Sequence, residues 1–168
     1  MSTIQEEFDK LIEEQQELTK RFQSKAQELF KATTKEFFDK NPGVTAVTWT
    51  QYTPYFNDGD TCVFSVNEPY FTNANDEQME DVTRWGEYEG EAEGVWSESD
   101  WIFSGDSDYC RERRKDLNLE GTDSQSIVKF SRLIQSGEMD TVIQAMFGDH
   151  VRVTATRDGF DVDDCDHD

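Results

Sequence analysis

Residues 44–51 read VTAVTWTQ, a run rich in β-branched and aromatic side chains. Such a run predicts a strand, because successive side chains of a strand point to opposite faces and each face receives every second residue. We expect this strand to continue to Phe56 and to turn at Asp58-Gly59 into a second strand over residues 61–66, since Asp-Gly supplies the positive φ angles of a tight hairpin. Because Pro54 has no N–H to donate, the first strand is expected at a sheet edge, or with a bulge there.

A long helix is predicted upstream, over residues 3–40. Thr3 and Glu6 have the spacing of a capping box, and Asn41-Pro42-Gly43 ends the helical pattern. The apolar positions follow a 4-3 alternation typical of a coiled coil, with polar Gln15 and Lys25 at the skipped seam positions. These apolar positions are Ile4, Phe8, Leu11, Leu18, Phe22 and Leu29.

Two interpretations of this helix stay open. In one, it pairs with another helix, for example that of a second copy in a homodimer, and Leu11, Leu18 and Phe22 mediate the self-association. In the other, it is an amphipathic helix that lies on its own sheet, since Phe37 and Phe38 widen the apolar stripe near its end.

The rest of the chain predicts short helices and a second hairpin. Residues 124–147 have helical spacing with a break at Gly137, which indicates two short core helices. Residues 151–156 and 160–162 flank Arg157-Asp158-Gly159, a second Asp-Gly turn. The sequence therefore predicts an α+β fold, with a long N-terminal helix, a small antiparallel sheet of about four strands and two short helices on one face. Its parts are a coiled-coil-like helix at 1–41 and one α+β domain at 42–168, which includes an acidic aromatic segment at 76–108 and an acidic tail at 158–168.

The net charge is the most unusual property of the composition. The 168 residues include 37 Asp and Glu against 16 Lys and Arg, a formal charge of −21. Such a field repels nucleic acid and anionic membranes and steers the chain toward basic surfaces, although acidity also simply aids solubility. The chain begins without an apolar leader and contains no apolar run of membrane-spanning length, so a cytoplasmic location is expected. Cys62, Cys110 and Cys165 form no CxxC pair and are expected to be reduced.

No pattern of residues predicts catalysis. The two histidines, His150 and His167, lie late in the chain, and no nucleophile, phosphate-loop or HExxH motif is present. Residues 57–60 lack the spacing of a calcium loop, and a like-charged terminal run is more often solvated than metal-bound. We therefore expect no enzyme activity, no cofactor and no metal site.

The acidic aromatic segment is the better candidate for a binding site. It holds twelve acidic residues against Arg84. In an extended conformation Glu87, Glu89, Glu91 and Glu93 would project from one side about 6.8 Å apart, close to the spacing of phosphates along a DNA strand. Tryptophans are frequent interface anchors, although core tryptophans beside a solvated loop would give the same pattern. The complete predicted partner-binding set is Glu87, Glu89, Glu91, Glu93, Glu98, Asp100, Trp85, Trp96, Trp101, Asp161, Asp163 and Asp164.

Residues 49–60, WTQYTPYFNDGD, resemble small uncharacterised proteins of tailed bacteriophages. By size and acidity the chain is also similar in class to phage-encoded DNA mimics that inhibit restriction, CRISPR and repair enzymes. The resemblance implies an inhibitor that occupies the basic nucleic-acid-binding groove of a host defence or DNA-processing enzyme in the bacterial cytoplasm and does not itself bind nucleic acid. The competing hypotheses are a non-catalytic assembly protein that works through its N-terminal helix, with acidity only for solubility, and a calcium-dependent module.

Overall fold

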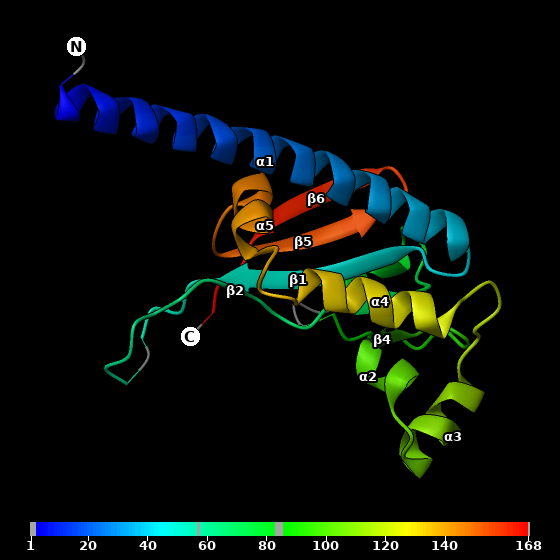
Figure 1. Cartoon of the computed structure of the whole chain (residues 1–168). Coiled ribbons are helices and arrows are strands. Elements are labelled where there is room, and N and C mark those ends of the chain that lie inside the picture. Colours follow the sequence, from blue (N-terminus) through cyan, green and yellow to red (C-terminus); the bar gives the residue numbers. More distant parts are fainter. Residues whose placement is uncertain (1–2, 57, 83–85, 168) are drawn as a thin grey trace.

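The centre of the fold is a six-stranded antiparallel sheet in the computed structural model, which describes residues 3–56, 58–82 and 86–167 (Figure 1). The α+β prediction is confirmed, with six strands in the described residues rather than about four. The strand order is β4-β3-β1-β5-β6, and β2 pairs with the end of β1. The strands are β1 (Ala46–Tyr52), β2 (Ser65–Val66), β3 (Tyr70–Thr72), β4 (Ser97–Ser99), β5 (Val151–Thr156) and β6 (Gly159–Asp164).

Strand β1 is central, so the prediction of an edge strand is wrong. It pairs with β5 over six residues on one side and with β3 on the other. Pro54 does not interrupt this ladder because β1 has already ended at Tyr52. Pro54, which has no N–H, therefore lies in the loop after β1, where no neighbouring strand requires a backbone donor.

The two Asp-Gly turns have different structures. The second is a tight hairpin as predicted, with Thr156 opposite Gly159. At the first, Asp58 and Gly59 have the expected positive φ angles of 38° and 91°. However, β2 contains only Ser65–Val66, so residues 53–56 and 58–64 form a loop rather than the predicted strands. Asn57 lies outside the described residues.

Helix α1 (Ile4–Lys40) confirms the predicted N-terminal helix and its capping box. The Thr3 Oγ1 accepts a bond from the Glu6 N–H at 3.2 Å, and the Glu6 carboxylate accepts one from the Thr3 N–H at 2.7 Å. At the other end, the buried Asn41 donates to the carbonyl of Phe37 and to Ser126, and it accepts from the Asp123 N–H. Asn41 therefore fixes the end of α1 to the start of the next long helix.

One face of the sheet is covered by the C-terminal part of α1 together with α4 (Ser124–Ile134) and α5 (Asp140–Phe147) (Figure 1). The predicted pair of short helices on one face is thus confirmed. Phe37 of α1 stacks on Phe130 of α4 with ring centroids 4.5 Å apart, and Phe30 stacks on Phe160 of β6 at 6.0 Å. The described residues also form three short helices that were not predicted: η1 (Gln78–Asp81), α2 (Asp100–Ser104) and α3 (Asp108–Asp116).

The acidic tail belongs largely to the sheet. Strand β6 continues to Asp164, two residues beyond its predicted end, and the Cys165 N–H donates to the carbonyl of His150. His167 is buried and stacks on Tyr52, with ring centroids 3.6 Å apart. Asp161, Asp163 and Asp164 are therefore held on a strand, although their side chains are exposed.

Two further predictions concern the whole chain. None of the helices in the described residues has both the length and the apolar character needed to cross a membrane. Cys62, Cys110 and Cys165 are free thiols, and the last two are buried.

Candidate acidic face

The second face of the sheet is polar, because its outward-facing positions hold Thr, Arg and Asp. Thr48 of β1 lies opposite Thr154 of β5, with their hydroxyl oxygens 3.5 Å apart, and Thr154 lies opposite Asp161 of β6. Arg152 lies opposite Asp163 in the same way. Since cross-strand partners share a face, Asp161 and Asp163 project on the side away from α1, α4 and α5. We call this side the polar face.

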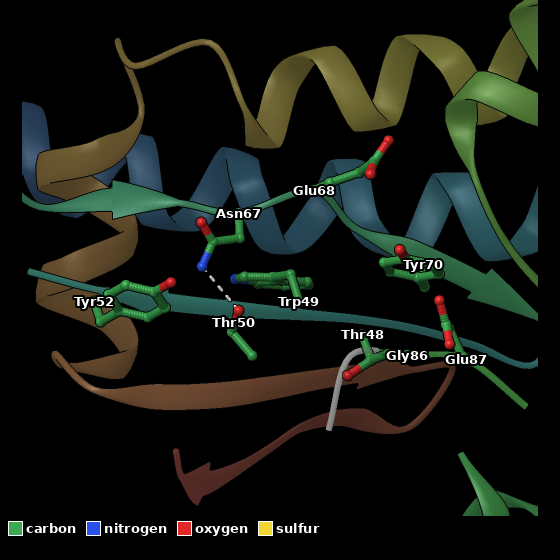
Figure 2. Close-up of a pocket in the computed structure, with 9 residues that line it drawn as sticks. All are labelled: Thr48, Trp49, Thr50, Tyr52, Asn67, Glu68, Tyr70, Gly86 and Glu87. Atoms are coloured by element: carbon green, nitrogen blue, oxygen red, sulfur yellow. Dashed lines mark hydrogen bonds between the residues drawn. The ribbon is translucent and has the colours of Figure 1, made fainter. Parts of the chain in front are cut away.

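A first hollow on the polar face has a volume of about 310 Å³ (Figure 2). The side chain of Asn67 donates to the Thr50 hydroxyl at 2.9 Å, which fixes one wall of the hollow to β1. Gly86 closes it with φ +81°, and a Cβ there would lie 2.5 Å from the Cβ of Tyr70. Only glycine fits this position without a shift of Tyr70. The lining residues are Thr48, Trp49, Thr50, Tyr52, Asn67, Glu68, Tyr70, Gly86 and Glu87.

Negative charge gathers around this hollow. Figure 2 shows the Tyr70 ring between the carboxylates of Glu68 and Glu87. Burial raises the pKa of the Tyr70 hydroxyl, and the charges of Glu68, Glu87 and Glu98 raise it further. Because carboxylates beside an aromatic ring attract a cation, the arrangement suits a Lys ammonium or an Arg guanidinium group.

A second hollow of about 340 Å³ lies beside the first, where the segment around η1 meets β5 and β6. Asp76 and Glu80 come from that segment, and Asp161 and Asp163 come from β6. Arg152 is the only Lys or Arg among the described residues that line either hollow, and its guanidinium nitrogen lies 3.5 Å from Asp163. We define the acidic face as Glu68, Asp76, Glu80, Glu87, Asp161 and Asp163.

The basic residues are concentrated on helices. Of the 16 Lys and Arg residues, seven lie within α1, four within α3 and two within α4. Helices α1 and α4 pack on the opposite side of the sheet from the acidic face (Figure 1). Arg84 lies outside the described residues. The same three helices also carry 12 acidic residues, so their charges nearly balance, whereas the acidic face has six acids beside Arg152.

The four alternating glutamates are divided by the structure. Glu87 lines the first hollow, whereas Glu89, Glu91 and Glu93 are exposed on a loop that bends in a turn at residues 93–94. The described part of this segment forms one isolated bridge, between Val82 and Tyr88, and no strand before β4. The segment is therefore a loop and not a strand, and the expected row of evenly spaced carboxylates stays a prediction, with all four side chains exposed.

Glu98, Asp100 and Asp164 lie apart from the acidic face. Glu98 is half-buried and accepts a bond from the Arg113 Nε at 2.6 Å, so its charge is already paired. Asp100 is half-buried at the first residue of α2. Asp164 is exposed, but it lies opposite Val151, whose side chain belongs to the covered face. Because partners across the ladder share a face, Asp164 points away from Asp161 and Asp163.

The predicted tryptophan anchors also separate. Trp96 is 1% exposed and donates its indole N–H to the carbonyl of Asn118 at 2.9 Å, so it is a core residue and cannot anchor a partner. Trp101 is half exposed and stacks on Tyr109 with ring centroids 5.7 Å apart. Trp85 lies outside the described residues.

The two histidines meet near the end of β6. His150 Nδ1 lies 2.6 Å from His167 Nε2, and the Tyr55 ring stacks on both. Asp149 accepts two hydrogen bonds from Thr53. Burial raises the pKa of the Asp149 carboxyl, but these two bonds and the bond from the His150 N–H hold it below the usual range. These contacts fix the loop after β1 to the C-terminal residues.

Among the described residues, no three His, Cys, Asp or Glu side chains are grouped in a way that could hold a metal ion.

Sequence reasoning missed Glu68, Asp76 and Glu80. They join the acidic face only because the segments after β2 and β3 cross the polar face, and the local sequence does not predict that path.

Comparisons with protein-family models, curated proteins and solved structures gave no match for this chain. The resemblance of residues 49–60 to tailed-phage proteins therefore stays a prediction.

Proposed function

We propose that this protein binds the basic nucleic-acid-binding groove of another protein, a host defence or DNA-processing enzyme, in the manner of a phage-encoded DNA mimic. The acidic face is the surface that enters the groove. The observation that supports this proposal is the asymmetry of charge: acids from four separate parts of the chain gather on one side of the sheet, beside a single described arginine.

The asymmetry favours binding over solubility alone. A protein that needs charge only to stay in solution can spread its acids and bases evenly, since solubility depends mainly on net charge. Here the 13 bases of α1, α3 and α4 are nearly balanced by 12 acids on the same helices, whereas the acidic face has six acids beside one arginine. A surface of one sign steers association with a basic groove and releases the counterions of both partners.

The two hollows add specific binding positions for Lys and Arg side chains to the overall negative charge of the acidic face. The first hollow offers carboxylates and the rings of Tyr52 and Tyr70 to a Lys or Arg side chain. The second presents four carboxylates around Arg152. The Lys and Arg side chains of a groove that normally contacts phosphates could donate hydrogen bonds to the carboxylates of both hollows.

The proposal is tested with a triple variant in which Asp76, Glu80 and Asp161 become amides. Its control neutralises three exposed acids of α1, Glu13, Glu17 and Asp39, so both variants have the same net charge. Each protein is immobilised, exposed to bacterial lysate at low salt and eluted with duplex DNA, and the eluted proteins are identified by mass spectrometry. We expect the control to capture the same nucleic-acid enzymes as the wild type, and these enzymes to be displaced by DNA. The triple variant should capture roughly tenfold less of them or lower, since each lost charge-assisted contact weakens binding. Equal capture by both variants would exclude the acidic face as the binding surface.

The alternative function, an assembly protein that works through α1, is favoured by a different observation. Every described residue from Thr3 to Phe22 is exposed, including several large apolar side chains. This surface lies far from the acidic face along the chain, and the two proposals are tested by different variants.

A further inference from the structure

Helix α1 carries a stripe of large apolar side chains that the rest of the chain leaves uncovered. We define the stripe as Ile4, Phe8, Leu11, Leu18, Phe22 and Leu29, each more than half exposed. Figure 1 shows the N-terminal part of α1 extending beyond the edge of the sheet. Ile12 adds a further side chain that is 51% exposed. Apolar surface of this extent on a soluble protein is a mark of an interface.

The stripe is not a continuation of the face that packs on the sheet. Leu29 is 54% exposed, whereas its neighbour Phe30 is 1% exposed. Side chains one residue apart in a helix differ in direction by about 100°. On that geometry the stripe lies about 100° around the helix from the face that holds Phe30, Thr34 and Phe37. It therefore lies to the side of the face that contacts the domain, and Leu29 stays exposed even where α1 rests on the domain.

The spacing of the stripe is that of a coiled-coil seam. From Ile4 to Leu29 the seam positions alternate by four and three residues, with Gln15 and Lys25 as polar members. The seam is about 38 Å long at 1.5 Å per residue. The seven exposed apolar side chains of α1 present on the order of 700 Å² per chain, at roughly 100 Å² each. Two such surfaces together approach the standard size of a specific interface, about 1,600 Å².

We infer that the stripe pairs with the same stripe of a second copy, with the two helices antiparallel. A strict 4-3 seam is complementary to itself, so a second copy supplies the matching surface without any other partner. The orientation follows from charge. Residues 41–168 contain 28 acidic and 9 basic residues, a formal charge of −19. A parallel pair would place both of these domains at the same end, whereas an antiparallel pair places them at opposite ends.

One antiparallel register removes Lys25 from the paired seam. With Leu11 opposite Gln15 of the second copy, Ile4 meets Phe22, and Phe8 meets Leu18. Lys25 and Leu29 then lie outside the overlap, and Ile12 lies near its own counterpart at the two-fold axis. The six apolar side chains inside the overlap present about 1,200 Å² in the two copies together, at roughly 100 Å² each, which is the lower end of the range for specific interfaces. A parallel pair in register would instead place Lys25 against Lys25 in the seam, where two ammonium groups repel each other.

The first test measures the mass of the full-length chain in solution by sedimentation equilibrium up to about 100 μM, a range that detects dissociation constants near the micromolar level. We expect a dimer for the wild type, a monomer for Leu18→Asp and a dimer for Gln16→Asp. The Gln16→Asp control adds the same charge two residues away, on the side of the helix that faces away from the seam. A monomeric wild type would overturn the inference, and so would equal dissociation of the two variants.

The second test determines the orientation by disulfide cross-linking in a Cys62→Ser background, because Cys62 is the one partly exposed native thiol. Chains with Ile4→Cys are mixed with chains with Phe22→Cys and oxidised. The antiparallel register predicts mixed disulfide dimers and little cross-linking of either variant alone. Efficient self-linking of each variant alone would show a parallel pair and overturn the proposed arrangement.

Discussion

The two ends of helix α1 share one amphipathic sequence and have opposite environments. Near the C-terminal end, Phe30, Thr34, Phe37 and Phe38 are buried against α4, α5 and the sheet. Near the N-terminal end, no described residue from Thr3 to Phe22 is buried or half-buried. The comparison teaches that periodicity identifies an apolar face but does not identify what covers it. The angular offset between the two apolar faces is the informative feature, because it separates a contact with the chain's own sheet from a contact with another molecule.

The largest expected effect comes from shortening one phenylalanine at each end. Phe37→Ala removes a ring that stacks on Phe130, so we expect it to lower the free energy of unfolding by about 3–5 kcal/mol. Phe22→Ala should change the stability of the single chain by less than about 0.5 kcal/mol, since the side chain is 64% exposed. Urea denaturation at a concentration low enough to avoid pairing measures both. A large loss in Phe22→Ala under those conditions would mean that the N-terminal end packs on its own domain.

A smaller effect is expected at the junction of α1 with α4. Asn41→Ala removes three hydrogen bonds of a fully buried side chain, those with Phe37, Ser126 and the Asp123 N–H. We expect a loss of about 2–3 kcal/mol, because the former partners are left without a replacement. Ser126→Ala is the matched control, which removes only one of the three bonds and should lose about 1 kcal/mol. If urea denaturation gave equal losses, the bonds of Asn41 to the backbone would contribute little.

How far the fold follows from local sequence is clearest at the two Asp-Gly turns. Asp158-Gly159 lies between two runs that both alternate, and the predicted hairpin forms over six residue pairs. Asp58-Gly59 adopts the predicted φ angles, but the adjoining residues leave the sheet after Tyr52. Asp58 and Gly59 both have positive φ, whereas in the second turn Gly159 does, at 145°, and Asp158 does not. The length of pairing therefore depended on the flanking strands and not on the turn residues. Strands β3 and β4 have three residues each, too few for a period to be recognised.

The candidate site was less predictable because it is made by tertiary packing. Glu87, Asp161 and Asp163 were named from their local pattern and do lie on the acidic face. Glu68, Asp76 and Glu80 complete that face only through the path of the loops that cross the polar side of the sheet. Trp96 and Trp101 are five residues apart and look alike in sequence, yet one is in the core and the other is half exposed. Composition gives the sign of the surface charge, and the fold decides where that charge gathers.

The smallest expected effect is at the exposed end of α1, where Thr3→Ala removes half of the capping box. The Thr3 hydroxyl accepts the Glu6 N–H at 3.2 Å, and loss of such a cap costs about 1 kcal/mol of local helix stability. Because every described residue of this end is exposed, we expect the loss to appear as fraying, with roughly fivefold faster amide exchange in the first turn, and not as a change in the global unfolding free energy. Hydrogen exchange measured residue by residue separates the two, with Asn41→Ala as the variant that should alter the global value. A global loss in Thr3→Ala would show that the first turn is coupled to the core, and the independence of the two ends of α1 would then have to be abandoned. Purely local fraying would instead show that this end is ordered mainly by its own cap until the stripe is covered.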